Sequence, residues 1–346
     1  MSYNLAFGYI IFRPYTSWYQ TVIEGTTEIG KLYLSDGRVL PKINGTSIQG
    51  MIRHSHIRFL KKVMPETLKK ILEHSPEATS FIAGKTQMLG LKYNKEFRDK
   101  IAEIPFLTVF GVGIANYLPQ RKYSVGDAIP VFDNDEIRHI YRHYIRAKGI
   151  LQKHFSEISL PEPKKMPEKL VETEVRRRVD LKLVYKDVGV EYRETQYEFK
   201  TEEKAKSEEE EEKKDPYRGM IMNIEKAETL MPLISVAIQS ELGLWSPEEI
   251  GVLIGSVMEM PNYIGPKTNI CDIYFVAVFR KTGEEKEVVV AKEVGFDPQV
   301  NEEAKSFLDA YVKWLKETDV YGRIVEIVDQ YIKQGIAEKK VRVRHQ

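Results

Sequence analysis

The sequence predicts an α+β protein, because segments with strand patterns and helix patterns follow one another along its 346 residues. Residues 4–15, "NLAFGYIIFRPY", are rich in aromatic and β-branched side chains and meet Pro14, as expected of a strand that ends there. Residues 48–73 have a helical pattern that Pro65 is expected to break. The segments "CDIYFVAVF" and "KEVVVAKEVGF" predict two more strands, and from Glu302 the chain is expected to be helical.

The segments between these elements give weaker patterns. "GKLYLSDGRVLPKI" predicts two strands around a turn at Asp36 and Gly37, and residues 76–130 are expected to form short strands and loops. Acidic and amide side chains at 133–135 predict the N-cap of a helix that follows them. Residues 220–245 predict a strand and then a helix. In the C-terminal helix, one apolar stripe is expected to face the core, and it consists of Phe307, Ala310, Tyr311 and Trp314.

Charge is distributed unevenly along the chain. The net charge is only +1, but residues 1–150 contain 21 Lys and Arg against 13 Asp and Glu, whereas the remainder contains 31 against 38. This asymmetry suggests a polyanionic partner for the first half. Residues 201–215, "TEEKAKSEEEEEKKD", have no aromatic or β-branched apolar side chain and are not expected to join a core.

The compartment expected from the sequence is the cytoplasm. Cys271 is the single cysteine, so no intramolecular disulfide can form, which is typical of proteins in a reducing environment. The N-terminal segment "MSYNLAFGYIIFRPY" lacks the pattern of a signal peptide. No apolar run approaches the ~20 residues that a membrane-spanning helix requires.

A glycine-bracketed hydroxyl loop precedes the first predicted helix, in "INGTSIQGMIRH". Free amides at a helix N-terminus, with the hydroxyls of Thr46 and Ser47, can bind an anion, and Arg53 and His54 could add contacts to a phosphate. An ordinary Ser/Thr cap in front of a solvated basic face fits the residues equally well. The loop is not a Walker phosphate loop, because the GK[ST] ending is absent.

A second basic segment begins at residue 170 and predicts a hairpin around Lys186 and Gly189. Arg176, Arg177 and Arg178 alternate across a strand, so at least one of them faces outward in either register. Arginines beside tyrosines suit phosphate pairing and base stacking. A solvated edge strand protected by its charges is the alternative.

Three histidines share one predicted helix. His139, His143 and His154 fall within one stripe if that helix is continuous, and histidines at i and i+4 can share a zinc ion. Cys271 could complete such a site from a distant part of the chain. A helix face directed to solvent or to RNA is the alternative, because the helix is basic throughout.

The segment "LPKINGTSIQGMIR" resembles the "LPYIPGSSLKGALR"-like signature of the CRISPR-associated RAMP superfamily, and more narrowly that of the backbone (seven-type) subunit of CRISPR effector complexes. Three segments agree with it in order: "TTEIGKLYL", "RKYSVGDAIPV", and "ETEVRRRVDL" with its return "VEYRETQYEF". From the first to the last of them, these segments span roughly half of the chain, from residue 26 to residue 199. The length of the chain and its charged insert are most similar to those of the type I-D version of this subunit.

The resemblance implies a ferredoxin-like, RRM-like palm with an inserted helical subdomain and a β-hairpin thumb. Residues 1–160 would hold the first part of the palm, 161–216 the thumb and the charged insert, and 217–346 the rest of the palm with the C-terminal helices. The expected RNA-binding residues are Lys31, Arg38, Lys42, Gly45, Thr46, Ser47, Gln49, Gly50, Arg53, His54, Arg121, Lys122, Arg176, Arg177, Arg178 and Arg193.

The sequence departs from the family at two places. The C-terminal glycine-rich loop is reduced to "YIGPKTNI", and the aspartate with which type III relatives cut RNA is replaced by Leu32 or Tyr33, with Asp36 the nearest carboxylate. The expectation is therefore a non-enzymatic subunit that binds CRISPR RNA, further copies of itself and other effector subunits, and presents the guide to its target in antiviral defence. The alternatives are an endoribonuclease that uses His54 or Asp36, and an adaptor that binds only protein and is stabilised by zinc at His139, His143 and Cys271.

Overall fold

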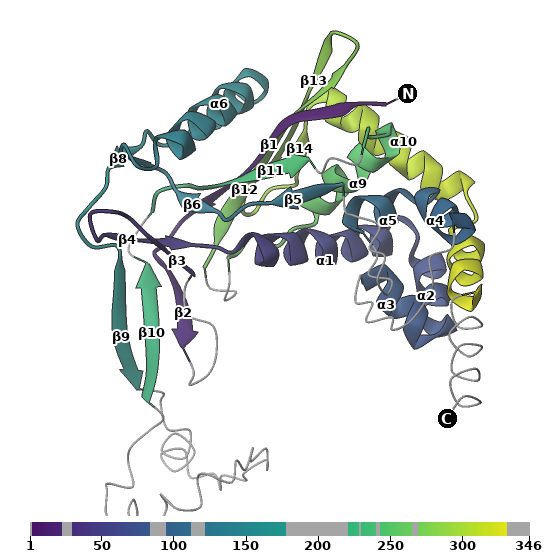
Figure 1. Cartoon of the computed structure of the whole chain (residues 1–346), viewed down its shortest axis with the longest axis horizontal. Coiled ribbons are helices and arrows are strands. Elements are labelled where there is room, and N and C mark those ends of the chain that lie inside the picture. Colours follow the sequence, from purple (N-terminus) through teal and green to yellow (C-terminus); the bar gives the residue numbers. More distant parts are fainter. Residues whose placement is uncertain are drawn as a thin grey trace, which may run out of the picture.

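The computed structural model describes residues 2–22, 30–83, 95–111, 122–177, 221–227, 230–239, 243–264 and 269–330. Within these residues the protein is a mixed α+β structure, as the sequence predicts, built on one large antiparallel sheet (Figure 1). None of the described helices is long and apolar enough to cross a membrane.

The main sheet has seven strands in the order β14-β13-β12-β1-β11-β5, with β6 also paired to β11. Its strands are β1 (Asn4–Pro14), β5 (Tyr123–Val125), β6 (Ile129–Pro130), β11 (Leu233–Gln239), β12 (Cys271–Lys281), β13 (Glu284–Lys292) and β14 (Gln299–Val300). β1 therefore lies between strands that are more than two hundred residues away in sequence. The expected divisions 1–160 and 217–346 thus contribute strands to the same sheet.

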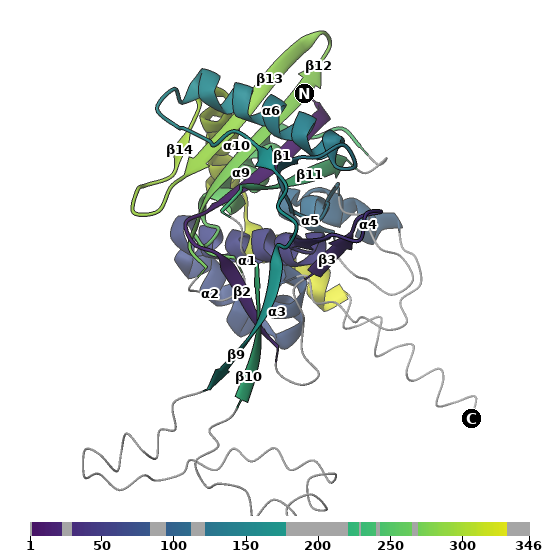
Figure 2. The same cartoon turned by 90° about the vertical axis from the view of Figure 1, so that its left-hand side faces the viewer.

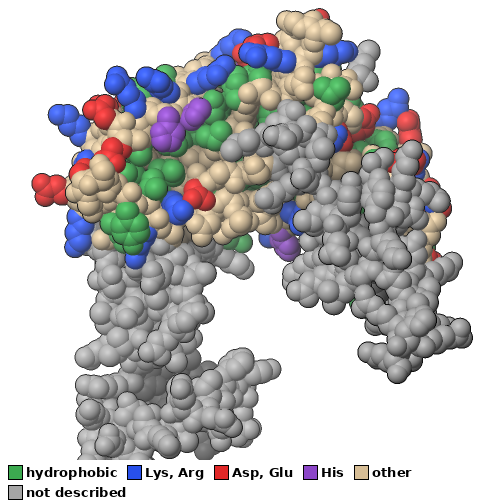
Figure 3. Space-filling model, in the orientation of Figure 1, with side chains coloured by type: hydrophobic (Ala, Val, Ile, Leu, Met, Phe, Trp, Pro, Cys, Tyr) green, Lys and Arg blue, Asp and Glu red, His purple; other side chains and the backbone are tan. Residues whose placement is uncertain are grey.

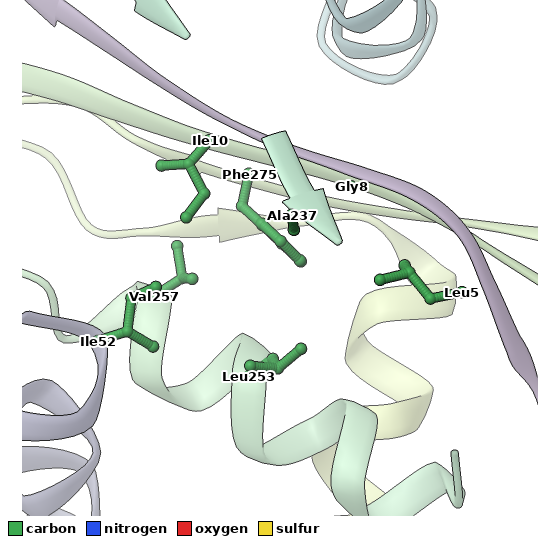
Figure 4. Close-up of a pocket in the computed structure, with 8 residues that line it drawn as sticks. All are labelled: Leu5, Gly8, Ile10, Ile52, Ala237, Leu253, Val257 and Phe275. Carbon is green, nitrogen blue, oxygen red and sulfur yellow. The ribbon is translucent and has the colours of Figure 1, made fainter. Parts of the chain in front are cut away.

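Helices cover one face of this sheet and enclose the larger core (Figure 1). They are α1 (Gly45–Val63), α5 (Pro105–Phe110), α9 (Pro247–Met258) and α10 (Glu302–Glu317). Gly8 pairs with Ala237 on one side and Ala277 on the other, so a row of small residues crosses three strands here. A small apolar cavity of about 10 Å³ remains between this row and Leu253 of α9 (Figure 4).

The opposite face of the sheet is covered by α6 (Arg138–His154), as Figure 2 shows. Tyr144, Ala147 and Leu151 of this helix join a second core with Tyr9 and Tyr274 of the sheet. The sheet is therefore buried on both sides, and residues that alternate along β1 and β12 belong to different cores.

Two further groups of elements extend from the same side of the body, with α1 running between them (Figure 1). One is a three-stranded antiparallel sheet in the order β2-β10-β9, formed by β2 (Trp18–Val22), β10 (Ile221–Ala227) and β9 (Val171–Arg177). The other is a helical group of α2 (Pro65–His74), α3 (Pro76–Ala83) and α4 (Lys95–Ala102). Residues 320–330 are also helical and pair with this group through His74–Asp329 and Lys100–Glu326, and Arg323 pairs with Glu103 just after α4.

Two short pairings complete the structure. β3 (Gly30–Tyr33) pairs with β4 (Val39–Lys42) in an antiparallel hairpin, and β7 (Phe132–Asp133) pairs in parallel with β8 (Lys164–Lys165). Gly37 in the turn after β3 has a φ of 85°, a conformation that glycine adopts without strain. The turn expected at Asp36 and Gly37 is confirmed.

Several predicted elements have the expected bounds. The first strand ends at Pro14, the first helix ends at Val63 before Pro65, and the C-terminal helix begins at Glu302. In that helix, Phe307 and Tyr311 are buried as predicted.

Other predictions were wrong. The described parts of 76–111, residues 76–83 and 95–111, contain three helices and no strand. α6 begins at Arg138 with Ile137 at its N-cap position, so the residues at 133–135 are not its cap. Residues 220–245 contain the two strands β10 and β11 and no helix in their described part. Of the hairpin predicted at 170–199, the first arm is described as far as residue 177 and pairs with β10, beyond the charged insert. The turn and the return arm lie outside the described residues, so the hairpin stays a prediction.

Candidate nucleic-acid interface

The N-terminus of α1 is joined to a distant loop by Asp127. The backbone nitrogen of Gly45 donates to Asp127 Oδ1 at 2.8 Å, and Lys42 Nζ lies 2.6 Å from Asp127 Oδ2. Partial burial raises the pKa of Asp127, but hydrogen bonds from Lys42 and Gly45 outweigh it and hold this pKa below its usual value. The carboxylate therefore occupies the position at the helix N-terminus where the sequence predicted a bound phosphate.

This junction brings together two of the segments on which the family resemblance depends. Lys42 and Gly45 belong to "LPKINGTSIQGMIR" and Asp127 belongs to "RKYSVGDAIPV". The helix begins at Gly45, so Thr46 and Ser47 lie in its first turn, and Asn44 at the N-cap makes no side-chain capping hydrogen bond. The predicted Ser/Thr cap is therefore wrong, and a carboxylate from another segment replaces it.

The two glycines of the motif have different roles. A Cβ atom at Gly45 would lie 2.0 Å from the carbonyl oxygen of Val125, so this glycine permits the backbone of its own chain to approach. A Cβ atom at Gly50 would meet no atom within 4 Å. Only Gly50 is therefore open to an external ligand.

Exposed polar residues form a continuous stripe along α1. They recur at intervals of three or four residues, so they share one face of the helix. This face lies opposite Ile48, Ile52 and Phe59, which are buried against the sheet and α9. We define the α1 stripe as the exposed residues Ser47, Gly50, His54, Arg58 and Lys61. The helix contains no Asp or Glu, so no carboxylate on α1 itself neutralises the stripe.

Two of the predicted RNA-binding cations are engaged inside the protein. Arg53 donates to the carbonyl oxygens of Phe110 and Gly111 at the end of α5, the latter at 3.2 Å. Lys122 Nζ lies 2.7 Å from the buried carboxylate of Glu249 and 2.8 Å from the carbonyl oxygen of Leu244. Their partners are 57 to 127 residues away in the chain, so no local sequence pattern indicates these contacts.

Three further predicted residues, on the β3–β4 hairpin and in α1, are less exposed than the α1 stripe. Arg38 Nε donates to Asp36 Oδ2 at 2.7 Å, and its NH1 donates to the carbonyl oxygen of Met166 at 3.3 Å. Hydrogen bonds from Arg38 lower the pKa of Asp36. Lys31 is half-buried, and Gln49 is only 7% exposed. The cation of Arg38 therefore has partners within the protein.

His56 cannot act as a phosphate ligand or a general base at neutral pH. It is 1% exposed in a cluster with Phe106, Phe110 and Tyr311, and its Nε2 lies 2.8 Å from the Tyr311 hydroxyl. Burial lowers the pKa of His56 to about 3, so the ring is neutral in the folded protein. His54, two residues earlier, is exposed on the α1 stripe.

The predicted zinc ligands do not come together. Cys271 is buried in the core on the α1 side of the sheet, whereas α6 with His139 and His143 covers the opposite side. His143 Nδ1 lies 3.1 Å from the Tyr9 hydroxyl, and His154 Nε2 lies 2.7 Å from Glu287 Oε2. Within the described ranges, no three His, Cys, Asp or Glu residues are grouped so that they could hold a metal ion.

The alternative expectation for this helix, an exposed basic face, agrees better with the structure. Lys, Arg and His side chains gather over α6 in Figure 3. Lys148 and Lys153 have carboxylate partners in Glu162 and Glu287, whereas Arg142 is exposed and has no ion pair among the described residues.

The remaining predicted residues are described in part or not at all. Arg176 and Arg177 lie in β9, where they pair with Met222 and Ile221, and only their backbone is described. Arg121, Arg178 and Arg193 lie outside the described residues. The RNA-binding residues expected from the sequence omit Arg58 and Lys61, although their helical spacing from Ser47, Gly50 and His54 places them on the same face of α1.

No protein-family model matches the chain, and no curated protein matches its sequence. Three solved structures are similar to it at low identity. A chain of a type IV-B CRISPR complex is 11% identical with a TM-score of 0.41, over 80% of this chain and 92% of that one. Csc2 of Thermofilum pendens is 10% identical with a TM-score of 0.33, over 93% and 80% of the two chains. A chain of a CRISPR RNA-guided surveillance complex, pre-nicking, is 9% identical with a TM-score of 0.34, over 78% and 75%. Scores this low do not by themselves establish a shared fold or function.

Proposed function

We propose that this chain is the RNA-binding backbone subunit of a CRISPR surveillance complex and that a single RNA strand lies along the α1 stripe. The observation that carries the proposal is the stripe itself, which presents His54, Arg58 and Lys61 on one exposed face of a helix without acidic residues. Cations in a row along a rigid element suit the regular charges of a phosphate backbone.

The order of the central strands supports a ferredoxin-like palm. Along the chain, α1 lies between β1 and the short strands β5 and β6, and α9 lies between β11 and β12. In the sheet, β1 lies between β12 and β11, and β5 and β6 lie beyond β11. This is the arrangement of a split β-α-β-β-α-β unit with both helices on one face.

The projecting β2-β10-β9 sheet is proposed as the thumb. It stands at one end of α1, and the helical group of α2 and α3 stands at the other end (Figure 1). An RNA strand that follows the α1 stripe would therefore extend from one projection of the subunit to the other. Further copies of the chain would continue this path along the guide, which the resemblance of "LPKINGTSIQGMIR" to backbone subunits implies.

The experiment is a titration of fluorescent single-stranded RNA with wild-type protein and with the double variant Arg58→Glu/Lys61→Glu. We expect wild-type binding and at least a roughly tenfold loss in the variant, because two phosphate contacts become repulsions. The matched control is Lys305→Glu/Lys313→Glu on α10, which changes the net charge equally at two other exposed lysines.

Two results would contradict the proposal. A wild-type protein that does not bind RNA would refute the proposed function and favour the protein-only adaptor. Equal loss in the stripe variant and the α10 control would mean that only net charge matters, and that α1 is not the interface.

A further inference from the structure

An aromatic side chain stands unsupported on the hairpin that leads into α1. Tyr33 is 71% exposed, a value that among the described large hydrophobic residues only Phe296 shares. Its neighbours Leu32 and Leu34 pack against the core under α6, so strand alternation places Tyr33 on the outer face together with Lys31. Within the described residues, the Tyr33 ring makes no aromatic contact and its hydroxyl makes no hydrogen bond.

The hairpin that carries this ring is held at several points. Gly30 packs so closely on β4 that a Cβ atom there would lie 2.8 Å from the carbonyl oxygen of Lys42. At the other end, the backbone nitrogen of Ser35 donates to Glu136 Oε2 at 2.9 Å, and Arg38 holds Asp36 and the carbonyl oxygen of Met166. The ring is therefore presented by a fixed element, which lowers the entropy lost when it binds a partner.

The hairpin leads into the helix that carries the α1 stripe. β4 leads directly into α1, and the two elements are aligned end to end in Figure 1. Tyr33 pairs with Val39, which precedes Gly45 by six residues, so at about 3.3 Å per residue the ring lies roughly 20 Å from the start of α1. A single strand held on the stripe could reach the ring within a few nucleotides.

We propose that Tyr33 stacks on a nucleobase of the RNA strand whose phosphates are held by the α1 stripe; this inference rests on the proposed function. Proteins that bind single strands combine cations for the backbone with aromatic rings for the bases. A protein partner fits this ring less well, because its neighbours Lys31, Ser35 and Asp36 are polar and a protein interface would need a contiguous apolar patch.

The test compares Tyr33→Ala, Tyr33→Phe and Phe296→Ala in RNA titrations at several salt concentrations. We expect Tyr33→Ala to weaken binding roughly 5- to 150-fold, which is the usual effect of losing one stacked base. The slope of log affinity against log salt should stay unchanged, because stacking releases no counterions. Tyr33→Phe keeps the ring and should bind within about twofold of wild type, and Phe296→Ala, on a loop between β13 and β14, should bind as wild type.

Each contrary outcome has its own meaning. Wild-type affinity in Tyr33→Ala, with RNA binding otherwise intact, would overturn the stacking but leave the proposed function standing. A change in the oligomeric state of RNA-free Tyr33→Ala, measured by light scattering, would assign the ring to a protein contact and also overturn it. If wild-type protein does not bind RNA, both the proposed function and this inference fail. Because the ring is exposed, thermal unfolding of both Tyr33 variants should match wild type.

Discussion

Gly45 and Gly50 are five residues apart in α1, and the same substitution should have opposite effects at the two positions. Gly45→Ala would place a Cβ atom 2.0 Å from the carbonyl oxygen of Val125 and should destabilise the protein by about 3 kcal/mol or more. Gly50→Ala meets no atom within 4 Å and should stabilise the helix by roughly 0.5–1 kcal/mol. Chemical denaturation of both variants checks this pair, and destabilisation of Gly50→Ala would contradict the exposed position of the α1 stripe.

His56 gives the protein a pH-dependent stability. Its pKa is about 3 in the folded state and about 6.5 in the unfolded chain, so below pH 6.5 only the unfolded chain takes up the proton. The contribution of the neutral His56 ring to the free energy of unfolding is complete above pH 6.5 and is lost as the pH falls towards 3.

The unfolding free energy of wild type relative to His56→Gln should therefore fall by about 1 kcal/mol between pH 7.5 and pH 5.5. Denaturant titrations of both proteins at these two pH values measure the difference. A difference that is equal at both pH values would show that His56 is not buried as a neutral group.

Among the helices and strands, the sequence predicted those whose own residues have a clear helix or strand pattern. Runs of β-branched residues predict β1 and the pair β12–β13. Pro65 predicts the break between α1 and α2, because proline interrupts a helix. α5 was missed because "PFLTVF" is a short apolar segment, and periodicity cannot distinguish a buried helix turn from a buried strand. The β9–β10 pairing was missed because it joins segments on both sides of the charged insert.

The same distinction applies to the interface. The motif around Gly45 could be located from the sequence. The residues of the α1 stripe could also be found from it, because they recur at every third or fourth position. The roles of Arg53 and Lys122 could not be predicted, since Phe110 and Glu249 meet them only after the helices pack. Asp127 at the helix N-terminus is likewise a tertiary contact, which no local capping pattern indicates.

The contact of α9 with the sheet provides a test at this scale. Leu253 is 4% exposed and borders the small cavity beside Gly8 and Ala237 (Figure 4). Leu253→Ala would enlarge this apolar cavity and should cost about 3–5 kcal/mol, at the upper end for such substitutions, because the small residues opposite cannot fill the space. Leu72→Ala, at a position that is 40% exposed, is the control and should change the unfolding free energy by less than about 1 kcal/mol. Equal effects would contradict the packing of α9 on β1 and β11.

At the scale of the whole molecule, the described groups that could cut RNA lie in three different environments. Asp36 is paired with Arg38, His56 is buried and neutral, and His54 is exposed on a stripe without a carboxylate. Cleavage of a phosphodiester requires a base at the 2′-hydroxyl, or carboxylates and metal beside the phosphate. Among the described residues, Asp36, His54 and His56 do not form such a set. Binding without cleavage is therefore retained as a proposal.

We therefore expect purified protein to bind labelled guide RNA and its complementary target without cutting either strand, with or without magnesium or manganese. The measurement is denaturing electrophoresis after prolonged incubation, with Asp36→Ala and His54→Ala prepared in parallel. Regularly spaced cuts that vanish in Asp36→Ala would replace the scaffold with a nuclease, and they would require Asp36 to leave Arg38 when RNA binds. Cuts that persist in Asp36→Ala and vanish in His54→Ala would instead place metal-independent chemistry on the α1 stripe, where His54 would have to act without a neighbouring acid.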